Sequence, residues 1–113
     1  MGNTCRSQMA EALARSFGHE AASAGTHPGM SVAANSLTVL EEMGVSTSGL
    51  KPKSVDDIET EGWDMIISMG CGVECPMLPI AEDWGLEDPV GLPIDVYRST
   101  RDTIIENLQR LSA

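Results

Sequence analysis

The sequence predicts a single α/β domain over residues 1–113, because three helical patterns alternate with short apolar segments. Alternation of this kind is typical of a parallel sheet covered by helices. Apolar residues make up 42% of the 113 residues, which is enough for one compact core. The sequence contains no internal repeat and no interdomain linker.

The first helix is predicted over residues 8–17, where Met9, Leu13 and Phe17 recur at helical spacing and Gly18 follows as a stop. Two further helices are predicted in the same way, the second between an N-cap at Ser31 and a stop near residue 44, and the last over residues 94–111. The residues expected to face inward are Ala33, Leu37, Leu40 and Met43 in the second helix and Tyr97, Ile104, Leu108 and Leu111 in the last.

Two strands are expected between these helices. Residues 21–25 are small, and residues 64–69 form a near-continuous apolar run of the kind buried in parallel sheets. Residues 70–93 follow as a long irregular stretch. Structureless runs of this length are rare in compact domains unless they have a function, so we expect part of a functional site there.

The charge balance limits the possible partners. Seventeen Asp and Glu stand against seven Lys and Arg, and a net charge of −10 argues against general nucleic-acid binding, which needs clustered cations. No apolar run approaches the roughly 20 residues that span a bilayer, and no signal segment opens the chain, so a cytoplasmic protein without a membrane partner is expected. His19 and His27 are expected in exposed loops and show no zinc-like spacing.

The first seven residues form a short turn before the first helix and have the composition of an anion cradle. Gly2 permits a tight turn, and successive backbone N–H groups of such a loop can point at one anion. The helix adds its own N–H groups and the positive end of its dipole. Arg6 supplies a planar fork suited to two oxygens of a phosphate-like ion. The residues expected to surround the oxyanion are Gly2, Asn3, Thr4, Cys5, Arg6 and Ser7.

The run Gly-Asn-Thr-Cys-Arg-Ser-Gln-Met-Ala-Glu, residues 2–11, resembles the phosphate loop of the low-molecular-weight tyrosine phosphatases and of the arsenate reductases that share their fold. The resemblance implies a three-layer sandwich, in which a four-stranded parallel sheet has helices on both faces. It also implies that Arg6 grips the oxyanion and stabilises the charge of its transition state, and that Ser7 lowers the pKa of a cysteine thiolate.

In this family the nucleophilic cysteine precedes the loop arginine in the pattern Cys-x5-Arg-Ser. The five residues before Arg6 are Met1 to Cys5, so the nucleophile is expected immediately before Met1. Cys5 is then the inner cysteine of the loop and not the attacking one. The family's first strand is expected to be missing too, and the 113-residue chain is expected to be inactive.

Cys71 and Cys75 lie four residues apart in a loop that contains glycine and follows the apolar run at 64–69. This spacing permits a disulfide if the loop bends. A zinc site needs about four ligands, and the sequence offers only one further cysteine. Two unreactive core cysteines are the plain structural alternative. A redox pair is the favoured interpretation, and the other two stay open.

The cysteine pair also distinguishes two branches of the resembled family. Phosphatases do not need it, whereas thioredoxin-coupled arsenate reductases have one. In that branch the loop thiolate attacks arsenate, and the first downstream cysteine attacks that sulfur and releases arsenite. The second cysteine resolves the disulfide, which thioredoxin or a similar dithiol protein then reduces. By this resemblance Cys71 is the relay cysteine and Cys75 the resolving cysteine.

Asp88 and Pro89 match the late Asp-Pro of the family, whose aspartate is the general acid in phosphatases. Val90 and Gly91 follow here, as in the reductases, whereas phosphatases usually have aromatic residues at this place. An ordinary Asp-Pro turn is the alternative.

Some reductases of this type hold a potassium ion near the phosphate loop, and no other cofactor is expected. Potassium prefers oxygen ligands, although ordinary polar residues explain the same positions equally well. Lys51 and Lys53 are expected to be solvated. The donors that the resemblance implies are Asn3, Glu11, Ser23, Ser54 and Asp56.

These patterns predict a thioredoxin-coupled arsenate reductase of the low-molecular-weight phosphatase fold, acting in arsenic detoxification. A low-molecular-weight tyrosine phosphatase is the first alternative, and the Cys71/Cys75 pair argues against it. A non-catalytic oxyanion-binding protein is the second alternative, and the absent nucleophile favours it.

Overall fold

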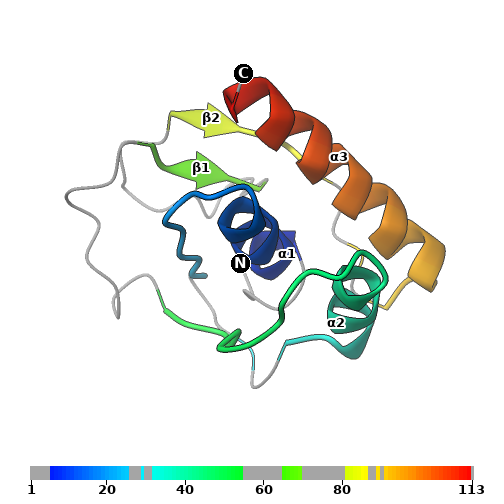
Figure 1. Ribbon diagram of the computed structural model, residues 1–113. Helices are drawn as coiled ribbons and strands as arrows, with labels where there is room; N and C mark the ends of the chain where they lie inside the picture. Colours follow the sequence, from blue (N-terminus) through cyan, green and yellow to red (C-terminus); the bar gives the residue numbers. More distant parts are fainter. Residues whose placement is uncertain are drawn as a thin grey trace.

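The computed structural model describes residues 6–25, 29, 32–54, 65–69, 81–86, 89 and 91–112. In chain order, the elements are helix α1 (Arg6–Ser16), helix α2 (Ala34–Glu41), strand β1 (Ile67–Ser68), strand β2 (Glu82–Asp83) and helix α3 (Ile94–Ser112). The three helices all contact one another, and the β1–β2 pair lies beside the C-terminal end of α3 (Figure 1).

The apolar core lies where the three helices meet. Met9 and Leu13 are buried on α1, as their spacing predicts, but Phe17 is 37% exposed because α1 ends at Ser16. Burial of such side chains is the main stabilising contribution to a fold of this size. The buried apolar residues are Met9, Ala12, Leu13, Val39, Leu40, Tyr97, Ile104 and Leu108.

Glycines end the first two helices, as predicted. Gly18 has a φ of 91°, its N–H donates to the Arg15 carbonyl at 3.0 Å, and the His19 N–H donates to the Ala14 carbonyl at 3.1 Å. These two bonds form the Schellman motif, which needs a left-handed residue that glycine adopts without steric cost. Gly44, with a φ of 70°, closes α2 through the same pair of bonds.

Helix α2 differs in detail from its prediction. Its N-cap is Ala33, which makes no side-chain capping bond, and the predicted cap Ser31 lies outside the described residues. Met43 was expected to face inward, but it is 50% exposed because the helix ends at Glu41. Val39 fills the core position instead.

Helix α3 matches its predicted bounds within one residue. Tyr97, Ile104 and Leu108 are buried on its inner face, and Leu111 is half-buried. The agreement follows from a long helical repeat, in which successive apolar residues lie on one side of the helix.

The strands are shorter than predicted. β1 and β2 pair in parallel with Ile67 opposite Glu82 and Ser68 opposite Asp83, so the parallel geometry expected of the apolar run is confirmed. The run itself is not fully buried, since its residues 66–69 are half-buried and Met65 is 43% exposed.

β2 falls inside the stretch that was expected to be irregular, because two charged residues give no strand signal. Residues 21–25 form no strand and contribute only an isolated parallel bridge between Gly25 and Ser54. Within the described ranges the sheet has two strands, and the four-stranded sandwich stays a prediction.

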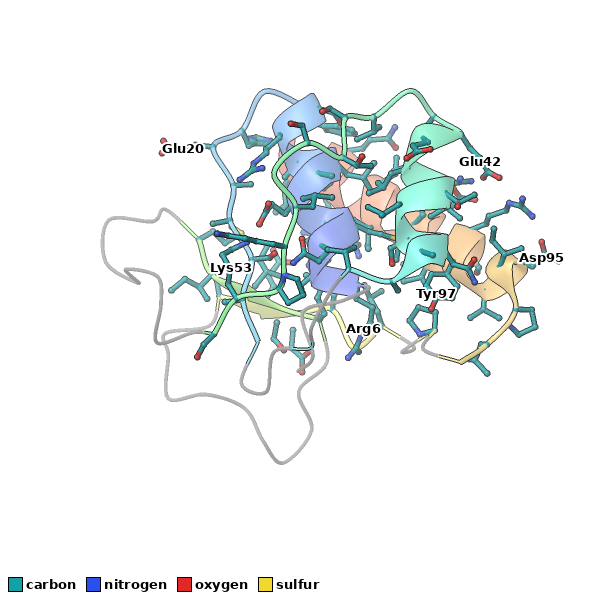
Figure 2. The ribbon with its side chains drawn as sticks, turned by 90° about the horizontal axis from the view of Figure 1, so that it is seen from below. Arg6, Glu20, Glu42, Lys53, Asp95 and Tyr97 are labelled. Atoms are coloured by element: carbon teal, nitrogen blue, oxygen red, sulfur yellow. The ribbon has the colours of Figure 1, made fainter. Side chains whose placement is uncertain are left out.

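An ion-pair network joins the end of α2 to α3. Arg98 donates to both carboxylate oxygens of Glu42, at 2.7 Å from Nη2 and 3.1 Å from Nε, and Arg101 Nη1 lies 3.0 Å from Glu42 Oε1. The pKa of Glu42 is held below its ordinary value, chiefly by the hydrogen bond from Arg98 and also by the bond from Arg101. Desolvation raises this pKa, but by less than the two arginines lower it. Figure 2 shows Glu42 and Asp95, both partners of Arg98, on the same side of the molecule.

We expect Leu13→Ala to lower the free energy of unfolding by about 2–5 kcal/mol, because it leaves a cavity where the three helices meet. Urea denaturation followed by circular dichroism measures this change. The matched control is Met43→Ala, which truncates a half-exposed side chain and should cost no more than about 0.5 kcal/mol. Equal losses in the two variants would contradict the placement of the core.

We expect the Glu42 network to stabilise the protein only where Glu42 is ionised. The pKa of Glu42 is lowered from 4.5 on folding, so its contribution is complete above pH 4.5 and is lost as the pH falls through the folded-state pKa. Glu42→Gln should therefore be less stable than the parent at neutral pH, and the difference should shrink in acid. Urea denaturation across this pH range tests this, with Glu41→Gln, an exposed neighbour, as control.

Candidate functional site

The N-terminal end of α1 presents the two described residues of the predicted anion cradle. Arg6 is buried to 8% exposure at the first position of the helix, and Ser7 is half-buried beside it. Figure 2 shows Arg6 at this end of α1. The first turn holds no acidic side chain that would repel an anion. The other cradle residues, Gly2, Asn3, Thr4 and Cys5, lie outside the described residues.

The Arg6 guanidinium joins α1 to the ends of both strands. Its Nη1 donates to the carbonyl of Met69 at 3.0 Å and to that of Leu86 at 2.7 Å. The Met69 carbonyl also accepts the Leu86 N–H at 2.8 Å, so the three residues form one closed set of bonds. Charge-assisted bonds of this kind are stronger than neutral ones and fix the plane of the guanidinium.

This arrangement brings together segments that are distant in sequence. Met69 immediately precedes the stretch that contains Cys71, and Leu86 stands two residues before Asp88. Ligands of open α/β sheets bind at the carboxyl ends of parallel strands, and both carbonyls lie just past those ends. Cys71, Cys75 and Asp88 themselves lie outside the described residues.

Gln8 fixes a further segment against α1. Its side chain is fully buried, and its Nε2 donates to the Lys51 carbonyl at 2.7 Å. Lys53, two residues further along that segment, bonds to the chain between α1 and α2. Its carbonyl accepts the Gly25 N–H at 2.8 Å. Gln8 was not predicted from the sequence, although a polar residue beside the apolar face of a helix is the signal that could have indicated it.

Glu11 lies one turn further along α1 and is the most enclosed charge of the site. Its side chain has no exposed surface, and Oε1 accepts from Ser23 Oγ at 2.8 Å and from Lys53 Nζ at 3.3 Å. Arg15 Nη1 lies 3.1 Å from Oε2, close enough for an ion pair but without hydrogen-bond geometry, so Oε2 accepts no hydrogen bond within the described residues. Two cationic groups therefore balance one buried carboxylate, which is the condition under which a buried charge is tolerated.

Two of the five predicted potassium donors, Glu11 and Ser23, are thus in direct contact. Ser54 belongs to the same neighbourhood through its bridge to Gly25, whereas Asn3 and Asp56 lie outside the described residues. Among the described residues, no three His, Cys, Asp or Glu side chains come together as a metal site. The expectation that Lys53 is solvated was wrong, since its side chain is only 18% exposed, but Lys51 is exposed as expected.

Two further expectations concern the histidines and membrane spans. His19 is exposed, as predicted, and His27 lies outside the described residues. In the part of the chain that the structure describes, no helix combines the length and apolar character that crossing a membrane requires.

The parallel strand pair and the helices packed beside it define an α/β protein, and sequence comparison gives its family. The family model described as low molecular weight phosphotyrosine protein phosphatase matches residues 1–113. The chain belongs to this family. Its neighbours in sequence and structure include arsenate reductases.

One relative is the glutaredoxin arsenate reductase of Synechocystis sp. (strain ATCC 27184 / PCC 6803 / Kazusa), 35% identical over 119 residues that cover 98% of this chain and 90% of that protein. The arsenate reductase of Staphylococcus aureus (strain Newman) is 31% identical, covering 96% and 90%. Among solved structures, an arsenate reductase in the phosphate binding state superposes with a TM-score of 0.85 at 35% identity, covering 97% and 89%.

We expect Arg6→Lys to lower the free energy of unfolding by about 1–2 kcal/mol, because a lysine ammonium lacks the reach and the fixed planar geometry with which the guanidinium bonds two carbonyls at once. Chemical denaturation measures the loss. The control is Arg110→Lys, an exposed arginine paired with Glu82, which should change stability by no more than about 0.5 kcal/mol. A loss at position 6 no larger than at position 110 would refute the joining function of Arg6.

Proposed function

We propose that the protein reduces arsenate to arsenite through a cysteine relay, and that a dithiol protein of the thioredoxin or glutaredoxin type recycles the relay. The observation that supports it most is the position of Arg6. This guanidinium lies at the N-terminal end of α1 and bonds the two chain segments that lead to Cys71 and to Asp88.

Residues 2–7 are proposed to bind the oxyanion. A tetrahedral oxyanion suits a helix N-terminus with an arginine fork, because the N–H groups and the guanidinium supply several donors to its oxygens. Arsenate and phosphate share this geometry, so both are proposed ligands. Ser7 is proposed to donate to the nucleophilic thiolate and to favour its charged form.

The proposed relay uses the electrons of two thiols. A cysteine thiolate immediately before Met1 attacks arsenate and displaces water, forming an As–S bond. The Cys71 thiolate then attacks that sulfur, a disulfide forms, and arsenic leaves as arsenite with the electron pair of the As–S bond. Cys75 attacks Cys71 and frees the nucleophile, and a dithiol protein reduces the Cys71–Cys75 disulfide.

Phosphomonoester hydrolysis is the second candidate, because the family is named for phosphotyrosine phosphatases. The resemblance of Asp88 and Pro89 to the family's late Asp-Pro implies a general acid at Asp88. The two functions share the oxyanion loop. They differ in the cysteine pair, which hydrolysis does not use.

We expect the chain, extended upstream by a strand that ends in cysteine, to turn over arsenate with glutaredoxin and glutathione or with thioredoxin. Cys71→Ser should lower turnover by about 100-fold or more, because no disulfide can then release arsenite. Cys75→Ser should stop the reaction after roughly one turnover per chain. The time course of arsenite release measures all three, and Met43→Ala, a change at an exposed position, is the control with activity retained.

Several results would contradict this proposal. Hydrolysis of an aryl phosphate without arsenate turnover assigns the protein to phosphatase chemistry. Arsenate turnover by the 113-residue chain that disappears on Cys5→Ser would refute the assigned nucleophile. Phosphate binding without either activity in the extended chain would indicate a non-catalytic oxyanion-binding protein.

A further inference from the structure

We infer that the ammonium of Lys53 is a built-in cation beside helix α1, so that this chain needs no potassium ion at Glu11. The inference concerns the charge that holds the site together and does not depend on which reaction the site performs. It rests on the contacts of Glu11, Lys53 and Gln8, all of which lie in the described part of the chain.

Both oxygens of the buried Glu11 carboxylate already face a cationic group. Oε1 accepts from Lys53 Nζ at 3.3 Å, and Oε2 lies 3.1 Å from Arg15 Nη1 as an ion pair without hydrogen-bond geometry. A metal ion at this carboxylate would be a third positive charge within contact distance of the other two. Repulsion between like charges is strong at Lys53, whose side chain is only 18% exposed, and weaker at Arg15, whose side chain is 46% exposed and screened by water.

Lys53 bonds to a main-chain carbonyl as well as to the Glu11 carboxylate, and a bound cation would use both kinds of oxygen. Its Nζ donates to the Lys51 carbonyl at 3.1 Å, and the same carbonyl accepts Gln8 Nε2 at 2.7 Å. Gln8 and Glu11 are three residues apart and therefore lie on one face of α1. The segment at residues 51–53 is thus linked to the helix at two neighbouring points, by the Lys53 ammonium at Glu11 and by Gln8 at the Lys51 carbonyl.

The Glu11 carboxylate also binds a third segment, the chain around Ser23. Ser23 donates to Glu11 Oε1, the oxygen that Lys53 contacts, and the chain after Ser23 bonds to residues 53 and 54 at Gly25. Three segments therefore meet around one carboxylate, one turn beyond Ser7 of the predicted loop. Figure 2 shows Lys53 on the segment that passes alongside α1. Holding such segments together is what an inorganic cation does where it serves a structural purpose.

The test compares melting temperatures in potassium chloride and in tetramethylammonium chloride at equal ionic strength. The parent chain should melt at the same temperature in both salts. Lys53→Met should melt lower by about 4 °C or more in tetramethylammonium chloride, and potassium should restore part of the loss by reaching the uncovered Glu11 oxygens. Lys51→Met, which removes an equal charge from the same segment but keeps the carbonyl, is the control and should behave as the parent.

Lys53→Arg should keep the parent's insensitivity to potassium, because it keeps a cation beside Glu11. A potassium-specific rise in the melting temperature of the parent chain would overturn the inference and assign a metal ion to the site. If Lys53→Met lowers the melting temperature and potassium does not raise it again, the inference is overturned too, and Lys53 is an ordinary ion-pair partner. If Lys53→Met does not fold, the salt comparison on the parent and on Lys53→Arg still decides the question.

Discussion

The arrangement of the site depends on the hydrogen bonds that the Arg6 guanidinium makes to two main-chain carbonyls. One nitrogen of this side chain bonds the carbonyls of Met69 and Leu86 and thereby sets the end of the strand pair against the start of α1. The carbonyls are partly enclosed, so removing the donor leaves them without the bond that offset their desolvation. The residue expected to bind an oxyanion is therefore also a structural residue, and a change at this position affects the stability of the fold whatever it does to binding.

The helices could be predicted because their signals are local. The 3.6-residue repeat gives the inner face of α1 and α3, and Gly18 and Gly44 supply the left-handed residue that ends a helix. The strands could not be predicted in the same way. β2 consists of Glu82 and Asp83, whose extended conformation comes from pairing with a distant segment and not from their own preference.

The place of Arg6 and Ser7 at the start of α1 could be predicted from one short motif, whereas contacts between distant segments could not. Arg6 and Ser7 stand in a motif whose residue types and order are enough to indicate an anion cradle. Lys51 and Lys53, by contrast, are the same residue type in the same segment, yet one is exposed and the other lies on Glu11. Residues two apart in an extended chain share a face, so the local pattern treats the two lysines alike, and only the position of α1 determines which one meets a carboxylate.

Helix α3 is attached at both ends by exposed ion pairs and along its middle by apolar contacts. Arg98 binds Glu42 near its start, and Arg110 binds Glu82 of β2 at 2.6 Å near its end. Exposed ion pairs weaken as salt screens them, whereas apolar contacts do not. Higher ionic strength should therefore loosen these two attachments while the apolar contacts of Tyr97, Ile104 and Leu108 keep α3 on the core.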